Sequence, residues 1–303
     1  MAASDCLSGI LTIFVKTMHM RKIFYLFIYI AVIAMFYSCG NSKNNEQNVI
    51  YVSIAPLKPI IEGIVGDDYT VKILVPQGAS PETFEPTPKQ FIALNESVMI
   101  FSIGLLDFEK ALLEKVHDQS KIVNLSTGVA TIAGSCSHTH HGKHCHHGID
   151  PHIWCSPKSI NIMASNAYNA IVAQMPDKDY AANYSTLNQR ITALDQQVKQ
   201  LCDSAALPYF IIYHPALTYL ARDYGLEQVA IEKDGKEPSV KQVAEIIDRA
   251  RTSGIKRVFY QSEFPQSSVA IFAEDIGANA VEINPLAEDI FTNIPTMVTL
   301  ITE

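Results

Sequence analysis

The sequence lacks the patterns that mark nucleic-acid-binding proteins and common zinc enzymes. It has 23 Lys and Arg residues against 31 Asp and Glu residues, for a net charge of −8, so a nucleic-acid partner has no electrostatic support. We find no HExxH pattern and no nucleophile elbow, which argues against a hydrolytic enzyme. The six cysteines follow no zinc-finger spacing and no recognisable disulfide framework. Cys155 and Cys202 lie in apolar patterns, and we expect both to be buried thiols.

The N-terminal region resembles a secretion signal. A basic start at Met20 precedes an apolar run at residues 23–37, which has the length of a signal-peptide core and is short for a membrane span. The run ends at Cys39 in a pattern that resembles a bacterial lipobox, whose cysteine is lipidated. We therefore expect residues 1–38 to be an upstream extension and a lipoprotein signal peptide, and residues 39–48 to be a flexible tether. The alternatives are an ordinary cleaved signal and an uncleaved anchor.

Short apolar runs alternate with helix-like segments in two series. The runs are nearly continuous in Val, Ile and Leu, as the strands of buried parallel sheets are. We therefore predict an α/β protein with two lobes, each a four-stranded, mostly parallel sheet flanked by helices. The predicted strands are 49–54, 70–75, 98–103, 121–125, 209–213, 227–231, 256–261 and 280–283. The predicted helices are 57–65, 89–95, 108–117, 157–174, 177–205, 216–224, 239–252, 266–276 and 291 onward.

A long helical segment separates the two series. Residues 177–205 repeat apolar side chains at three- or four-residue spacing, which is typical of one buried helix face. We predict an N-terminal lobe at 49–175, a linking helix at 176–205 and a C-terminal lobe at 206–303. Ligands of open α/β sheets bind beyond the carboxyl ends of the strands. Two such sheets can therefore face each other across a binding cleft.

Seven of the ten histidines lie between Cys136 and Trp154. Residues 136–148 mix His and Cys with Gly, Ser and Thr and show no hydrophobic period, so we expect a surface loop. Imidazole and thiolate favour zinc or a similar late transition metal. The alternative is a low-complexity insertion, and Cys136 and Cys145 can bind metal or pair with each other. The candidate ligands in this loop are His138, His140, His141, His144, His146 and His147.

Four further candidate ligands follow the ends of predicted strands. Glu82 lies in a proline-rich loop, and prolines stand beside His152, His214 and Asn284. Proline restricts the backbone, which lowers the cost of ordering a rigid metal site. The alternatives are a solvated loop acid at Glu82 and histidines that only pack or satisfy a strand end. Trp154 is expected to be a core residue.

These segments, in this order and spacing, resemble the metal-specific solute-binding proteins of bacterial ABC transporters, the ZnuA-like zinc and manganese group. The resemblance runs from about Val49 to the end of the chain. It implies two lobes joined by a long, rigid helix, with a metal held between them for delivery to a membrane permease. Zinc members of the group typically carry a histidine-rich loop. The segments that carry the resemblance are Gly78–Pro88, Asp150–Trp154, His214–Leu226 (HPALTYLARDYGL), Gly235–Ser239 (GKEPS) and Asn284–Ala287.

The resemblance also implies ligand roles. His152 and His214 stand where the group has metal-binding histidines. Glu82 replaces the usual first histidine, and a carboxylate there still suits Zn²⁺ while shifting preference toward Mn²⁺ or Fe²⁺. Asn284 stands at the position of an occasional aspartate ligand. Water, a loop histidine or Glu85 can take its place, although Glu85 more often has a structural role in such a loop.

We therefore predict a binding protein rather than an enzyme. Its function would be high-affinity capture of a divalent transition metal, foremost Zn²⁺, and delivery to an ABC permease at the cell envelope, where a lipid anchors the periplasmic protein to the membrane. The histidine-rich loop outweighs Glu82 in this choice of metal, because intrinsic divalent affinity also favours zinc over manganese. The alternatives are Mn²⁺ or Fe²⁺ uptake, a zinc-dependent envelope hydrolase, and an envelope metal buffer or adhesin.

Overall fold

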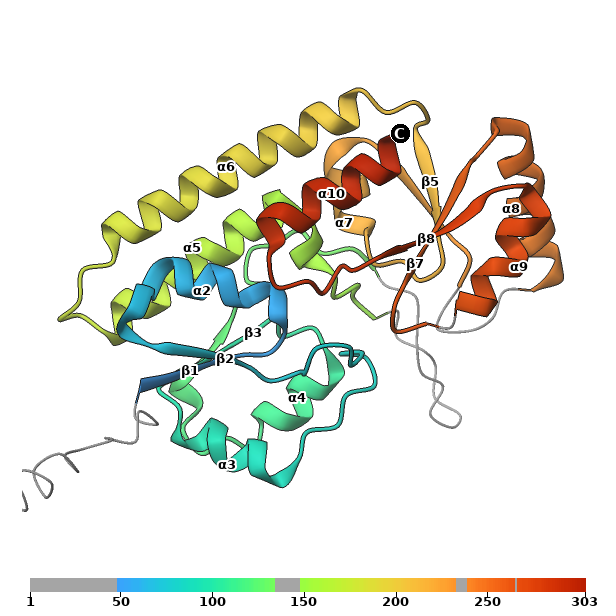
Figure 1. The fold of residues 1–303 in the computed structure, drawn as a ribbon. Helices are drawn as coiled ribbons and strands as arrows, with labels where there is room; N and C mark the ends of the chain where they lie inside the picture. The colour runs from blue at the N-terminus through green and yellow to red at the C-terminus, as the bar shows by residue number, and fades with distance from the viewer. Residues whose placement is uncertain (1–47, 134–147, 233–238, 265) are drawn as a thin grey trace, which may run out of the picture. The chain divides into compact units, whose positions relative to one another are not determined.

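The computed structural model describes residues 48–133, 148–232, 239–264 and 266–303 (Figure 1). The predictions for the signal peptide, for Cys39 and for the histidines of the loop lie outside these residues. The described residues form an α/β fold with two four-stranded sheets, and every strand pair in both sheets is parallel. The predicted fold class is confirmed.

The N-terminal sheet has the strand order β2-β1-β3-β4. All four residues of β3 are buried, as expected for a strand covered on both faces. Figure 1 shows α3 and α4 on one side of this sheet and α2 on the other. The elements are β1 (Val49–Val52), α2 (Lys58–Val65), β2 (Thr70–Ile73), α3 (Pro88–Glu96), β3 (Met99–Ser102), α4 (Asp107–Leu113) and β4 (Ile122–Asn124).

The C-terminal sheet repeats this arrangement, with the order β6-β5-β7-β8. Ser239 caps α8 with Gln242 in the predicted capping box, which is confirmed. The helices α8 and α9 lie on the outer side of this sheet (Figure 1). The elements are β5 (Tyr209–Ile212), α7 (Thr218–Tyr224), β6 (Glu227–Ala230), α8 (Val240–Ser253), β7 (Arg257–Gln261), α9 (Gln266–Ile276), β8 (Asn279–Ile283) and α10 (Ile290–Thr302).

Two long helices connect the sheets, α5 (Pro157–Gln174) and α6 (Ala181–Asp203). The 23-residue α6 packs against α2 and α5 and also against α10, so it contacts elements of both halves (Figure 1). The helix begins at Ala181 rather than at the predicted Asp177. The Asp179 carboxylate accepts the N–H of Ala181 at 3.0 Å, which satisfies a backbone donor of the first turn and ends the preceding loop.

One hydrophobic core runs through both lobes. Side chains alternate across a strand, so β5 contributes Phe210 and Ile212 to this shared core and Tyr209 and Ile211 to a second core on its other face. The shared core also contains Phe101 of the N-terminal sheet. Among the described residues, apolar burial is therefore continuous between the two sheets.

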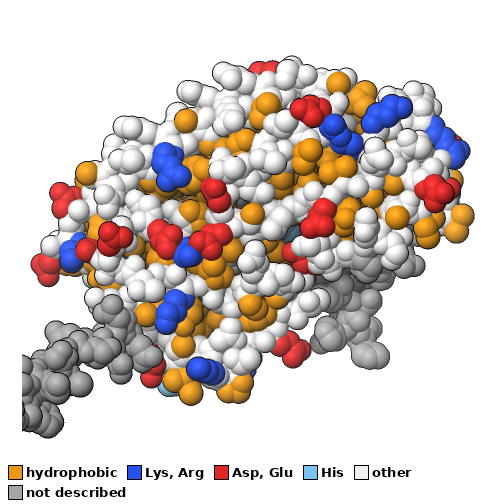
Figure 2. Space-filling model, viewed as in Figure 1, with side chains coloured by type: hydrophobic (Ala, Val, Ile, Leu, Met, Phe, Trp, Pro, Cys, Tyr) orange, Lys and Arg blue, Asp and Glu red, His pale blue; other side chains and the backbone are white. Residues whose placement is uncertain are grey.

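The remaining expectations about single residues also have outcomes. Trp154 is 2% exposed, which confirms its prediction as a core residue. Cys155 and Cys202 are buried free thiols, as predicted, and burial raises the pKa of Cys155 well above its ordinary value. None of the described helices has the length and apolar surface of a membrane span. Acidic and basic side chains are interspersed on the face shown in Figure 2.

Candidate metal centre

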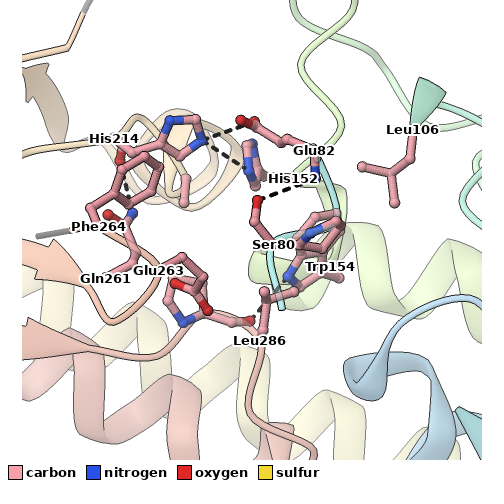
Figure 3. A pocket seen from close by; sticks show the side chains of 13 residues that line it. Ser80, Glu82, Leu106, His152, Trp154, His214, Gln261, Glu263, Phe264 and Leu286 are labelled. Carbon is pink, nitrogen blue, oxygen red and sulfur yellow. Dashed lines mark hydrogen bonds and ion pairs between the residues drawn. The ribbon is translucent and has the colours of Figure 1, made fainter. Parts of the chain in front are cut away.

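Three predicted ligands from distant parts of the chain meet at the junction of the lobes (Figure 3). The Nε2 atom of His214 lies 3.4 Å from Nε2 of His152 and 3.1 Å from Oε1 of Glu82. One ligand atom from each residue lies within 4.8 Å of the other two. Tetrahedral zinc with bonds of about 2.0–2.1 Å separates its ligand atoms by roughly 3.3 Å. The three side chains can therefore share one ion with little rearrangement.

The two histidines occupy short, fixed segments. His214 is the second residue after β5. Tyr213 before it donates its N–H to Phe259 O at 2.8 Å, and Gln261 Nε2 donates to the carbonyl of His214 at 2.9 Å. His152 comes directly before the 3₁₀ turn at Ile153–Cys155. Both histidines are 8% exposed, so their rings are held inside the junction rather than on its surface.

Glu82 lies in the loop between β2 and α3. The loop contains a turn in which Thr83 donates its N–H to Ser80 O at 3.3 Å, and the N–H of Glu82 lies 3.3 Å from Ser80 Oγ. Gln90 closes the loop, because its side chain completes the Thr87 capping box and donates to Leu74 O at 2.8 Å. The Glu82 side chain is 27% exposed, so the carboxylate forms the solvent side of the cluster.

A buried carboxylate contacts the Nδ1 atom of each histidine, on the opposite side of the ring from Nε2. Nδ1 of His152 lies 2.8 Å from Oδ1 of Asp150, and Nδ1 of His214 lies 3.0 Å from Oε2 of Glu232. Asp150 is 7% exposed and Glu232 is 9% exposed. A carboxylate at Nδ1 holds the proton on that nitrogen, which leaves the Nε2 lone pair for a metal and fixes the ring orientation.

The site carries an excess of negative charge. Burial alone would lower the pKa of His214, but hydrogen bonds and charges from Glu232 and Glu82 outweigh it and raise the pKa to about 9. Burial alone would raise the pKa of Asp150, but its hydrogen bonds with His152 keep the pKa below its ordinary value. Without a metal, His214 therefore holds a proton at neutral pH, and a divalent cation must displace that proton to bind.

The pocket around these atoms is small. It measures about 30 Å³, and its lining includes Ser80 and the three predicted ligands. Sites for organic ligands are usually about 300–1,000 Å³, whereas a cavity of about 10–15 Å³ already holds one water. Trp154 and Phe264 form part of the wall, with ring centroids 5.0 Å from those of His152 and His214 respectively. This apolar wall limits solvent access to the histidines.

The structure does not bring Asn284 into this pocket. Asn284 lines a neighbouring cavity of about 200 Å³, and its Oδ1 accepts the N–H of Leu286 at 3.0 Å. Glu85 is exposed and is not part of the pocket lining. The geometry therefore brings Glu82, His152 and His214 together, and Asn284 lines the neighbouring cavity.

Sequence reasoning missed the roles of Asp150 and Glu232. Asp150 was part of a recognised segment, but its side chain had no assigned function. Glu232 follows the end of β6 by two residues, the same placement that identified His214 after β5. The sequence could indicate Glu232 only by its position after a strand end. The contact between its carboxylate and the His214 imidazole is seen only in the folded structure.

Comparisons with known proteins point to one family. The family model of ZnuA, the periplasmic component A of a zinc-uptake complex, matches residues 50–301. The high-affinity zinc uptake system protein ZnuA of Bacillus subtilis (strain 168) is 29% identical over 282 residues, which cover 86% of this chain and 88% of that protein. The zinc-binding lipoprotein AdcA of Streptococcus pneumoniae serotype 4 is 25% identical over 264 residues, or 82% of this chain. The chain spans about half the length of the AdcA relatives, with 52% covered in this case.

Solved structures show the same fold. A crystal structure of a ZnuA deletion mutant with zinc bound is 31% identical, with a TM-score of 0.76, and the match covers 84% of this chain and 96% of that one. FpvC of Pseudomonas aeruginosa in complex with Mn²⁺ shares the fold with a TM-score of 0.70 at 19% identity, covering 84% and 96% of the two chains. Because the family model spans most of the sequence, the chain belongs to the ZnuA family of zinc-uptake components.

Proposed function

We propose that the protein captures a divalent transition metal, foremost Zn²⁺, outside the cytoplasm and delivers it to an ABC-type permease. The observation that carries this proposal is the convergence of Glu82, His152 and His214, with both Nε2 atoms facing one point and both Nδ1 atoms held by carboxylates. The names of the zinc-uptake relatives support the same cargo. Binding and delivery require no chemical reaction at this site, so we assign the protein no catalytic role.

The donor set suits zinc. Two imidazoles and one carboxylate are common zinc ligands, and a tetrahedral ion would take its fourth donor from water. We infer that Asn284 supports the neighbouring loop through Leu286 rather than acting as a direct ligand. An open fourth position also fits a cargo that must leave again, because a fully enclosed set of four protein ligands is typical of structural zinc.

The organisation around the site follows from the same proposal. We infer an N-terminal lobe at 49–175, a linking helix at 176–205 and a C-terminal lobe at 206–303, with the long α6 holding the lobes at a fixed spacing. Lipidation at Cys39, after removal of residues 1–38, would keep the protein at the membrane through the tether at 39–48. The tethered protein would then stay close to the permease it supplies.

Glu82→His should shift metal preference toward zinc. Carboxylate is the harder ligand, so imidazole at this position favours zinc over Mn²⁺ or Fe²⁺. We expect the ratio of zinc affinity to manganese affinity to rise by roughly tenfold, which corresponds to about 1.4 kcal/mol. Competition binding with the two metals measures this ratio. Glu85→His is the matched control, because this exposed carboxylate lies in the same loop outside the pocket; equal ratios in both variants would remove Glu82 from the ligand set.

Deleting residues 136–147 should leave one tight zinc site. We infer that the loop histidines form a weaker set that collects metal, separate from the cluster at the junction of the lobes. Calorimetric titration with zinc should show loss of the weaker sites, while the tight site keeps its one-to-one stoichiometry and its affinity. Loss of the tight site in the deletion variant would instead place the main binding function in the loop.

A further inference from the structure

Helix α7 of the C-terminal lobe holds the segment that carries His152. The Tyr219 hydroxyl donates to the backbone carbonyl of Asp150 at 2.7 Å and accepts the N–H of Ile132 at 3.1 Å. Tyr219 is 0% exposed and is among the largest fully buried side chains. Ile132 and Asp150 are themselves paired, because the N–H of Asp150 donates to Ile132 O at 2.9 Å. One phenol from the second lobe therefore bonds to both of these paired segments.

The Asp150 backbone leads directly to the metal-binding ring. Its Oδ1 atom accepts the backbone N–H of His152 at 2.9 Å and lies 2.8 Å from Nδ1 of the same residue. The position of the Asp150 main chain thus sets the position of its carboxylate, and the carboxylate sets the His152 ring. If the Tyr219 hydroxyl moved, the Asp150 carbonyl bonded to it would move as well. The Asp150 carboxylate would then shift the His152 ring and its Nε2 atom.

Other residues of α7 fix the same segment on both sides of His152. Arg222 donates to Ala130 O, and Asp223 accepts from Ser156 Oγ through its side chain and from Lys158 Nζ through its carbonyl. The helix itself begins at Thr218, four residues after His214. This short helix therefore lies close in sequence to one imidazole and is bonded to the segment that carries the other.

We propose that Tyr219 is a positioning residue of the metal site, whose hydroxyl sets the Asp150–His152 turn against His214 and so fixes the spacing of the two imidazoles. This proposal rests on the proposed function. It accounts for the 3.4 Å between the two Nε2 atoms, which is the spacing of zinc ligands. The histidine pair is prepared in advance, which lowers the ordering cost of binding.

Tyr219→Phe tests this proposal, because it keeps the buried ring and removes only the hydroxyl. The matched control is Tyr224→Phe, which removes the bond from a phenol on the same helix to Asp195, away from the metal site. For each full-length variant we would measure zinc affinity by chelator competition, the visible absorption of bound Co²⁺, and thermal unfolding without metal. Tyr219→Phe should lower zinc affinity by about 10- to 100-fold, the usual effect of losing a contact that orients a ligand. Its Co²⁺ bands should change in position or intensity.

The control should bind zinc and Co²⁺ as the wild type does. Wild-type affinity and an unchanged Co²⁺ spectrum in Tyr219→Phe would overturn the proposal. It would also be overturned if both variants lost affinity in proportion to their loss of thermal stability, because Tyr219 would then act only on the fold. If the wild-type protein itself bound neither zinc nor Co²⁺ tightly, the proposed function would fail, which is a different outcome from either of these.

Discussion

His214→Ala should lower zinc affinity by at least about a thousandfold. Loss of a residue that merely orients a ligand costs about 10–100-fold, and His214 would bind the ion directly, so its loss should cost more. The substitution also removes the imidazole that stands between two carboxylates, Glu82 at 3.1 Å and Glu232 at 3.0 Å. Without the imidazole between them, the negative charges of the Glu82 and Glu232 carboxylates would repel each other, which disfavours a compact site. Chelator competition at constant pH measures the change.

Two further variants test whether the loss of zinc affinity is specific to the proposed site. His117→Ala removes an exposed histidine that lies outside the pocket and whose backbone N–H donates to Asn95 Oδ1, so zinc affinity should stay at the wild-type value. Glu232→Gln keeps the size of the supporting side chain and removes its charge, so we expect an intermediate loss of about 10- to 100-fold. Equal affinities in His214→Ala and His117→Ala would refute the three-ligand cluster.

Zinc affinity should fall by about three orders of magnitude between pH 8 and pH 5. His214 has a pKa raised to about 9, and the metal binds only after the proton leaves, so each pH unit below that value costs about tenfold. The loss runs toward low pH, because protonation removes the lone pair that the ion needs. Titrations at several pH values, with circular dichroism to verify folding at each, give the slope directly.

Glu232→Gln again provides a control for this slope. The Glu232 carboxylate helps to raise the pKa of His214, so its replacement should lower that pKa and move the onset of the affinity loss to lower pH. An affinity that stays constant from about pH 8 to pH 5 in the wild type would contradict a site built on imidazole.

Strand and helix positions could be predicted because buried parallel strands are nearly continuous runs of apolar residues. The ends were less certain, because local side chains decide them, as Asp179 does at the start of α6. The ligand cluster was also predictable, since His214 follows a strand end and both histidines adjoin proline. Glu232 and Tyr219 could not be assigned, because their bonds join positions distant in the chain: Glu232 is 18 positions from His214, and Tyr219 is 69 positions from Asp150.

Asn284 shows a different limit of sequence reasoning. Its position after β8 was correct, but its side chain accepts the N–H of Leu286 at 3.0 Å, two residues along the chain. Asparagine commonly makes such a bond to its own backbone in turns. Because an asparagine can accept a hydrogen bond from its own backbone segment, its position after a strand is not enough to assign it as a metal ligand.

The two sheets have equivalent strand orders, so the two halves repeat one topology. Val52 pairs with Phe101 as Ile212 pairs with Phe259, so the residue two places beyond each first strand is equivalent, Ile54 in one half and His214 in the other.

Val75 and Glu232 are equivalent in the same way. Val75 donates its N–H to Ser53, the residue before Ile54, and Glu232 donates its N–H to Tyr213, the residue before His214. Ile54 is 1% exposed and Val75 is 4% exposed, so this half fills the equivalent place with hydrocarbon. The repeated topology thus contains two equivalent positions for a paired imidazole and carboxylate. Only the C-terminal half has these side chains there, His214 and Glu232, so the two halves contribute differently to the site.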